Sequence, residues 1–277
     1  MTENRIVFYD IPLAQPNICW SPNTWKTRGV QDFSSQRPCD NMTHDARYSL
    51  NFKGLAYTTE WVEYPDIEAL CIKIGAALTD VKSDGTTPEY TLPVIYDPST
   101  NKVISDSFNI AQYLNTTYPD TPQLIPPGTR ALQSGFTQYV NLRVKSILGQ
   151  FVRPVVFQRL PFGKSQQYFR RTREALYNVK IEEWAPQGED RVREWKRLRR
   201  ALIESLDGHY REAKEETGGD FLCGVDPTFV DFALAGILQW SKHILAAESE
   251  EWNNILSWQE GKWANFMSRL ERYAVVA

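Results

Sequence analysis

Three short segments carry the side chains that could do chemistry in this sequence: Ser21-Pro22, Leu92-Pro93 and Asp106-Ser107. Ser21 before Pro22 is typical of a helix start, because serine caps the helix and proline suits its first position. A serine hydroxyl there also lies in a positive field that would stabilise a bound anion such as a thiolate. Capping alone is the commoner use, so both roles stay open for Ser21.

A proline interrupts the apolar run at residues 91–95, where a central strand would lose a hydrogen bond because proline has no N–H group. We expect the strand to begin or bend at Leu92, with Pro93 in a cis peptide bond and the Leu92 backbone serving a partner outside the sheet. The alternative is an ordinary edge-strand proline.

Two small polar residues, Asp106 and Ser107, stand directly before the helical spacing of Phe108, Ile110 and Leu114. Such a pair caps a helix because it accepts hydrogen bonds from the amides of the first turn. The same helix end, with its positive dipole, can receive a ligand carboxylate. Capping is again the commoner use, and ligand binding is the alternative.

The composition limits the class of protein. A chain of 277 residues with 42% hydrophobic residues can form one large or two ordinary domains with a substantial core. The 31 basic and 34 acidic residues give a net charge of −3, which argues against non-specific nucleic-acid binding. No apolar run approaches the roughly 20 residues that span a bilayer, and the N-terminus lacks the apolar region of a signal peptide. We expect a soluble, intracellular protein with no nucleic-acid or membrane partner.

The cysteines and aromatic residues add little chemistry. The four cysteines are widely spaced, with no CxxC motif and no histidine cluster, which predicts reduced, mostly buried thiols and no metal site; they are Cys19, Cys39, Cys71 and Cys223. Nine tryptophans and an aromatic share of 13% are compatible with a pocket for flat aromatic ligands.

A regular order of elements would position the candidate residues. We expect a strand at 6–11, a helix from Ser21, helical spacing at 48–55 ended by Gly54, a strand at 56–64, a short helix to Ile74, a loop to Thr91, two strands, and a helix from Asp106. A βαβ unit followed by an antiparallel ββα unit is the thioredoxin-like arrangement.

Proline-rich residues 118–129 mark the expected domain boundary. Beyond it the sequence predicts helices at 130–156, 164–177 and 191–216, then an apolar helix headed by a reciprocal cap between Thr228 and Asp231. The basic run at 191–200 is interpreted as a solvated helix face, with Val192, Trp195, Leu198 and Leu202 on its inner side. We therefore expect a thioredoxin-like domain at 1–119, an all-helical domain at 130–277, and a ligand cleft between them.

Residues 29–46 interrupt the first helix with a polar, aperiodic, loop-like composition. Without them, the Trp-Lys-Thr-Arg sequence that ends at Arg28 would run into the Tyr-Ser-Leu sequence from Tyr48 as one helix. One hypothesis is a retained in-frame intron or a gene-model error, which sequencing of the mature transcript would test. The alternative is a genuine extruded loop.

Together, the Ser-Pro helix start, the mid-strand proline, Asp106-Ser107 before a helix and the Thr228/Asp231 cap resemble the cytosolic glutathione transferases over nearly the whole chain. The segments CWSPNTWKTR, LNFKGL, EWVEYPDI and TLPVI are similar to the serine-type fungal FuA class. That class is related to the bacterial β-etherases that cleave lignin-derived aryl ethers.

The resemblance implies a role for each candidate residue. Ser21 would stabilise the thiolate of glutathione, the co-substrate, and Asn23 would lie near the thiol. Leu92, before cis Pro93, would pair its backbone with the cysteinyl part. Asp106 and Ser107 would hold the ammonium and carboxylate of the γ-glutamyl end.

The function that this resemblance implies is conjugation of glutathione to, or glutathione-dependent cleavage of, small aromatic and possibly wood-derived electrophiles by a cytoplasmic homodimer without a metal. The alternatives are a carrier of hydrophobic aromatic compounds with little turnover and a non-catalytic module. Peroxide reduction is a third possible reaction. Cys19 as the active thiol is a minor alternative, since Pro22 selects Ser21 as the helix cap.

Overall fold

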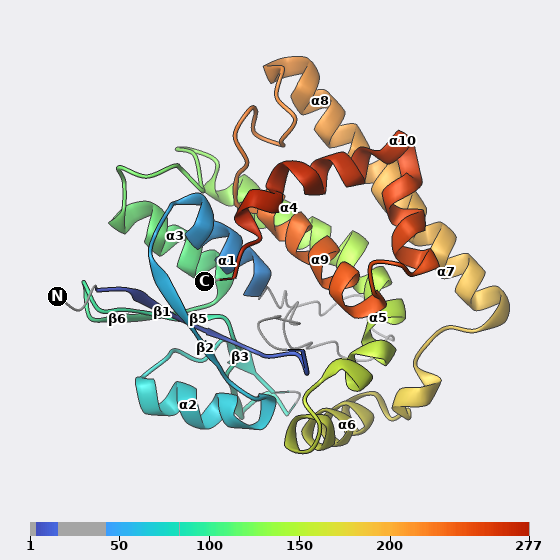
Figure 1. Ribbon diagram of the computed structural model, residues 1–277, viewed down its shortest axis with the longest axis horizontal. Coiled ribbons are helices and arrows are strands. Elements are labelled where there is room, and N and C mark those ends of the chain that lie inside the picture. The colour runs from blue at the N-terminus through green and yellow to red at the C-terminus, as the bar shows by residue number, and fades with distance from the viewer. Residues whose placement is uncertain (1–3, 16–42, 83, 277) are drawn as a thin grey trace.

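The computed structural model describes residues 4–15, 43–82 and 84–276 (Figure 1). Ser21 and Asn23, the helix start at Ser21, Cys19 and Cys39 therefore lie outside the described residues. Most of the predicted interruption at 29–46 lies outside them as well. Its last four residues, however, belong to helix α1 (Thr43–Phe52), so the prediction of a loop up to residue 46 is wrong there.

A four-stranded sheet forms the first part of the molecule. Its strands are β1 (Ile6–Asp10), β2 (Tyr57–Trp61), β5 (Val94–Asp97) and β6 (Lys102–Ser105), in the order β2-β1-β5-β6. β1 runs parallel to β2 and antiparallel to β5, and β5 pairs antiparallel with β6. With α1 as the crossover, this is the βαβ and ββα order that the sequence predicts, and the thioredoxin-like fold is confirmed.

Helices flank this sheet. α1 packs on α3 (Ser107–Thr117) on the side that faces the helical part, while α2 (Ile67–Ile74), which follows η1 (Tyr64–Asp66), lies on the opposite side (Figure 1). Gly54 ends α1 as predicted: it has a φ of 66°, and the N–H of Leu55 donates to the carbonyl of Leu50 at 3.1 Å.

The segment between α2 and Thr91 contains two short strands that the sequence analysis missed, β3 (Asp80–Val81) and β4 (Pro88–Glu89). Asp84 shapes the turn between them, because its carboxylate accepts hydrogen bonds from the N–H groups of Thr86 at 2.9 Å and Thr87 at 2.8 Å. A strand of two residues is too short to show the alternation of apolar and polar residues that identifies a strand. The turn residues of this segment therefore predicted only a loop.

The linker to the helical part is held by a side chain from α3 and by the side chain of the residue that follows α1. The Asn115 carbonyl oxygen accepts from the N–H groups of Leu124 at 2.9 Å and Ile125 at 3.3 Å, and the Asn115 amide donates to the Ile125 carbonyl at 3.2 Å. Lys53 donates to the Pro122 carbonyl at 3.0 Å, and burial lowers the pKa of Lys53 to about 8.

Every described element after residue 129 is helical, apart from a single bridge between Phe221 and Gly224, which confirms the second half of the predicted fold. The elements are α4 (Arg130–Val140), a π-helical turn η2 (Asn141–Lys145), α5 (Ser146–Arg159), α6 (Lys164–Tyr177), η3 (Ile181–Glu183), α7 (Gly188–Arg200), η4 (Ala201–Leu206), α8 (Asp207–Thr217), α9 (Phe229–Leu245), α10 (Glu250–Leu270) and η5 (Glu271–Tyr273). α9 lies at the centre of this part and also packs on α1, where the rings of Tyr48 and Phe232 stack with centroids 5.6 Å apart.

Two details of the helical part differ from the sequence predictions. Leu198 and Leu202 are buried as expected, but Val192 is 53% exposed, so the inner face of α7 is narrower than predicted. Of the two cysteines in the described part of the chain, Cys71 is buried as expected and Cys223 is exposed. No helix within the described ranges is long and apolar enough to cross a membrane.

Candidate functional site

One backbone hydrogen bond joins two of the three predicted site segments. The Leu92–Pro93 peptide bond is cis, as predicted, and β5 begins directly after it at Val94. The N–H of Asp106, at the end of β6, donates to the carbonyl of Pro93 at 3.2 Å. Leu92 and Pro93 are therefore held beside the start of α3.

Asp106 caps α3, as the sequence predicts. Its carboxylate Oδ1 accepts hydrogen bonds from the N–H groups of Phe108 and Asn109, both at 3.0 Å. The backbone of Asp106 has a φ of 78°, a conformation that costs a non-glycine residue about 1–3 kcal/mol. With Asp106 in this conformation at the N-cap, Ser107 is the first residue of α3, and its side chain is buried.

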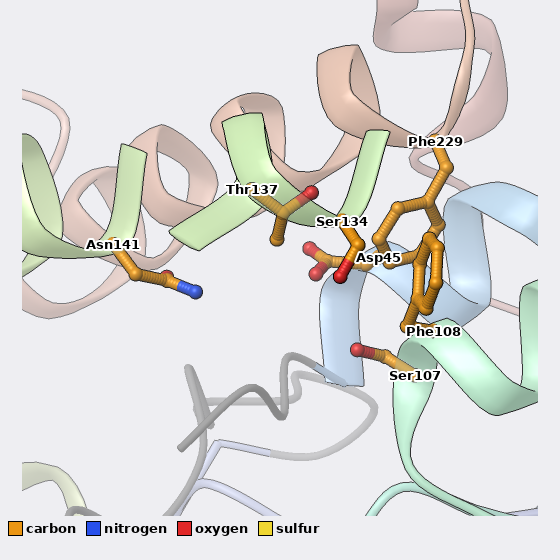
Figure 2. A pocket seen from close by; sticks show the side chains of 7 residues that line it. All are labelled: Asp45, Ser107, Phe108, Ser134, Thr137, Asn141 and Phe229. Carbon is orange, nitrogen blue, oxygen red and sulfur yellow. The ribbon is translucent and has the colours of Figure 1, made fainter. Parts of the chain in front are cut away.

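A small pocket, with space for no more than about one water molecule, lies where the start of α3 meets the helical part (Figure 2). It is lined by Asp45 of α1, Ser107 and Phe108 of α3, Ser134 and Thr137 of α4, Asn141 of η2 and Phe229 of α9. The hydroxyls of Ser134 and Ser107 lie near the Asp45 carboxylate, while the rings of Phe108 and Phe229, with centroids 5.2 Å apart, close one side. The cavity thus joins polar groups to an aromatic wall.

The structure brings some of the predicted site residues together. Ser107 lines the cavity directly, and Leu92, Pro93 and Asp106 are linked to it through the chain and the bond just described. The roles of Ser21 and Asn23 rest on the sequence alone.

Sequence analysis missed the cavity residues from the other elements. Asp45 was assigned to the interrupting loop, but it is fully buried in the first turn of α1, where a carboxylate suits the helix dipole. Burial raises the pKa of the neighbouring Tyr48, and the charge of Asp45 adds to this increase. Thr137 and Asn141 could have been found from the polar residues that recur every four positions between Gln133 and Lys145.

Neither described cysteine is suited to act as a nucleophile. Burial raises the pKa of the Cys71 thiol to about 11. Cys223 is exposed as a residue, but its sulfur is partly buried against Gln133, and this partial burial, followed by the charge of Asp231, raises the pKa of its thiol. The described residues also contain no group of three histidine, cysteine or acidic side chains that could hold a metal.

The fold and the site together define a thioredoxin-like protein with an appended all-helical part. The capped start of α3, beside the cis-proline, meets this helical part. The family models agree with this class: the model of the glutathione S-transferase N-terminal domain matches residues 41–117, and that of the C-terminal domain matches residues 131–273. The chain belongs to the glutathione S-transferase family, and the enzyme class predicted from the sequence is confirmed.

Close relatives are fungal enzymes. The crystal structure of glutathione transferase GSTFuA3 from Phanerochaete chrysosporium has 41% sequence identity and a TM-score of 0.84, covering 99% of this chain and 98% of that one. The glutathione S-transferase CsGST63524 of Ceriporiopsis subvermispora, solved in complex with glutathione, has 39% identity and a TM-score of 0.83, with 99% of both chains covered. A glutathione S-transferase-like protein, ustS of Aspergillus flavus, is 29% identical over 94% of this chain and 88% of its own length. The predicted similarity to the FuA class is confirmed.

Proposed function

We propose that this enzyme activates the thiol of glutathione for attack on small aromatic electrophiles, including wood-derived ones. The observation that carries the proposal is the hydrogen bond between Asp106 and Pro93, which sets the cis-proline segment beside the head of α3. At that helix head, Ser107 and Phe108 line a small pocket with an aromatic wall. An extended peptide can pair with the backbone at Leu92 while its charged end reaches Asp106 and Ser107.

The γ-glutamyl and cysteinyl parts of glutathione each have matching groups in this arrangement. The γ-glutamyl carboxylate suits the N-terminus of α3 and the Ser107 hydroxyl, because amides without helical partners and a positive dipole favour an anion there. The γ-glutamyl ammonium suits the Asp106 carboxylate. The cysteinyl part would lie along Leu92, with its sulfur towards Ser21 and Asn23.

Once the protein stabilises the thiolate of glutathione, it needs to contribute little else to the reaction. The thiol proton passes to solvent, and the Ser21 hydroxyl donates a hydrogen bond to the sulfur. The thiolate attacks the electrophilic carbon, a C–S bond forms, and the bond to the leaving group breaks with its electron pair. With a halide leaving group the product is a conjugate, and with an aryloxide leaving group the same step cleaves an aryl ether.

The test is the ultraviolet absorbance of the glutathione thiolate, measured against pH in the wild type and in Ser21→Ala. A free thiol with a pKa near 8.5 is only about 3% ionised at pH 7, whereas a bound thiol with a pKa near 6.5 is about 75% ionised. Ser21→Ala should return the pKa towards the solution value and lower kcat/KM at pH 7 about 25-fold. An unshifted pKa in the wild type, with glutathione bound, would instead favour the carrier.

A second variant tests the γ-glutamyl contact. Asp106→Asn keeps the capping oxygen and tolerates a positive φ, so folding stability should change by less than about 0.5 kcal/mol. It removes the charge that faces the ammonium, so the Kd for glutathione should rise by about 10-fold or more in calorimetric titrations. Deaminated glutathione, which lacks the ammonium, should bind wild type and variant equally well; a loss of affinity for this analogue as large as that for glutathione would refute the assignment.

The homodimer and the cytoplasmic location are part of the same proposal. Both rest on the family to which the chain belongs. Light scattering of the purified protein measures its molar mass in solution and so tests the homodimer directly.

A further inference from the structure

Four strand ends lie along one edge of the main sheet. β1 and β2 run parallel and end side by side, where Asp10 pairs with Trp61 in register. β5 runs the other way and begins at the same edge, with Val94 opposite Tyr9, so the cis-proline directly before Val94 lies there too. β6 ends beside that start, at the head of α3, and we call this row of strand ends the carboxyl edge. Adjacent strands lie about 4.8 Å apart, so the cis-proline is about 10 Å from the end of β2.

The chain that leaves β2 at the carboxyl edge is held by α6. Tyr64, three residues after the end of β2, is 4% exposed. Its N–H donates to Oγ of Ser165 at 3.3 Å, and its hydroxyl accepts a hydrogen bond from Nη2 of Arg173 at 2.6 Å. Its ring lies against Tyr168 and Phe169, with centroids 5.4 and 6.2 Å away. The backbone and the side-chain tip of Tyr64 are therefore both held by one helix of the helical part.

More exposed groups surround this contact. Oγ of Ser165 donates to Glu63 at 2.9 Å, and Nζ of Lys164 lies 3.6 Å from Glu63. Exposed ion pairs contribute little to stability. Ser165 and Arg173, by contrast, are 1% and 9% exposed, so their hydrogen bonds to Tyr64 are shielded from water and fix its position.

The chain that leaves β1 is tied to the same region. The N–H of Ala14 donates at 2.9 Å to the carbonyl of Arg159, the last residue of α5. The last carbonyls of a helix have no partner within it, so this bond uses a group that α5 itself cannot satisfy. We call residues 159–173, from this carbonyl to Arg173, the α5–α6 corner. Ser21 follows Ala14 by seven positions, so the corner holds the chain shortly before the residue proposed to stabilise the thiolate.

The most extensive contact between the two described parts lies elsewhere, where α1 packs on α9. There the ring of Phe232 lies 5.6 Å from that of Tyr48 and 5.3 Å from that of Phe52. These rings are buried, and burial of apolar surface is the main source of stability in such a contact. Loss of a single hydrogen bond at the α5–α6 corner should therefore leave the two parts together and change the placement of η1.

We propose that the α5–α6 corner positions the carboxyl edge for glutathione, with Tyr64, Ser165 and Arg173 as positioning residues. The proposal rests on the proposed function, which places glutathione along Leu92 with its γ-glutamyl end at the head of α3. An extended tripeptide is about 10 Å long, so its other end reaches towards the chain that leaves β2. A shift of η1 would change the surface against which glutathione lies and so weaken its binding. None of the three positioning residues needs to touch glutathione.

The test separates binding from turnover. Arg173→Met and Ser165→Ala should each raise the Kd and the KM for glutathione about fivefold, because each removes one hydrogen bond to Tyr64. The kcat at saturating glutathione should stay within about twofold of the wild type. Titration calorimetry gives the Kd, and turnover of chlorodinitrobenzene gives kcat and KM. A residue that served folding alone would instead lower the amount of active enzyme, and so kcat, with KM unchanged.

A double variant shows whether the effect passes through Tyr64. Tyr64→Phe removes the acceptor of the Arg173 bond and should also raise KM about fivefold. It deletes one atom, so it covers the case in which Arg173→Met does not fold. In the Tyr64→Phe background, Arg173→Met should add less than about 1.5-fold, because two changes that remove the same bond are not additive. A full further fivefold increase would overturn the role of Tyr64.

Arg170→Met is the matched control. Arg170 lies three positions before Arg173 in α6, but it pairs with Glu174 at 2.8 Å and with Glu182 at 2.6 Å at the surface. The control removes the same chemical group from the same helix without touching η1, and it should leave the KM for glutathione unchanged.

The outcomes distinguish this proposal from the proposed function. Unchanged Kd and KM in Arg173→Met, Ser165→Ala and Tyr64→Phe overturn the positioning role and leave the transferase function standing. If glutathione binds the wild type without a shift in the pKa of its thiol, the proposed activation fails, and the Kd values of the variants still decide the positioning role. If the wild type does not bind glutathione, both proposals are refuted.

Discussion

Asp10→Asn should lower the free energy of unfolding by about 3–5 kcal/mol, because it leaves the buried guanidinium of Arg47 without its counter-charge. Nη2 of Arg47 lies 2.7 Å from Oδ2 of Asp10, and the two side chains are 3% and 0% exposed. The pair joins α1 to the end of β1, so its loss acts on the crossover that the whole sheet depends on. Urea denaturation followed by circular dichroism measures the change.

The surroundings of this pair explain why the effect is large. Arg47 also donates to the Tyr57 hydroxyl at 3.3 Å and to Oγ1 of Thr59 at 3.2 Å, and its guanidinium carbon lies 4.8 Å from the centre of the Phe8 ring. Neutral hydroxyls and a ring face solvate a cation only partly. Without Asp10, the charge would remain in the interior and would have lost this carboxylate partner, while weaker contacts such as these persist.

Two controls isolate the buried charge as the cause. Glu68→Gln breaks the exposed pair with Lys82, whose atoms are 3.0 Å apart, and should cost less than about 0.5 kcal/mol. The double variant Asp10→Asn with Arg47→Met removes both charges and should recover a large part of the loss. A single variant that loses less than about 1 kcal/mol would refute the argument.

Arg47 also bears on the interruption at residues 29–46. A chain from which these residues are removed still has Arg47 directly before Tyr48, and so keeps the residue that pairs with Asp10. The Asp10–Arg47 pair therefore does not depend on whether the interruption is a retained intron or a loop, although the first four residues of α1 do. Transcript sequencing remains the test that distinguishes the two.

Local sequence patterns were sufficient to predict most of the helices and strands and part of the site. Helix α6 occupies the predicted residues 164–177, and the cis-proline and the Asp106 cap were both predicted, because a few neighbouring residues determine each. Pairing across the fold could not be predicted. Asp10 and Arg47 are 37 positions apart, and one sequence contains no sign that they meet. For the same reason Asp45 could not be placed in the cavity beside Ser107.

The reciprocal cap at the head of α9 was also predicted, and the structure shows that its carboxylate holds more than the helix start. Both Asp231 oxygens are occupied: Oδ2 accepts from the N–H of Thr228 at 2.8 Å and from its hydroxyl at 2.9 Å. Oδ1 accepts from the Tyr210 hydroxyl at 2.9 Å and the N–H of Leu222 at 3.1 Å. The side chain is fully buried and so joins α8, the loop after it and α9.

Asp231→Ala should therefore lower the free energy of unfolding by about 4 kcal/mol, since buried donors left without an acceptor cost about 1–3 kcal/mol each. Single losses should be smaller: Tyr210→Phe removes one donor together with its need for an acceptor, and Thr228→Ala removes one side-chain bond, at about 1 kcal/mol each. The graded series, measured by chemical denaturation, separates a network from a simple cap. If Asp231→Ala cost no more than Thr228→Ala, the carboxylate would be acting on the first turn of α9 alone.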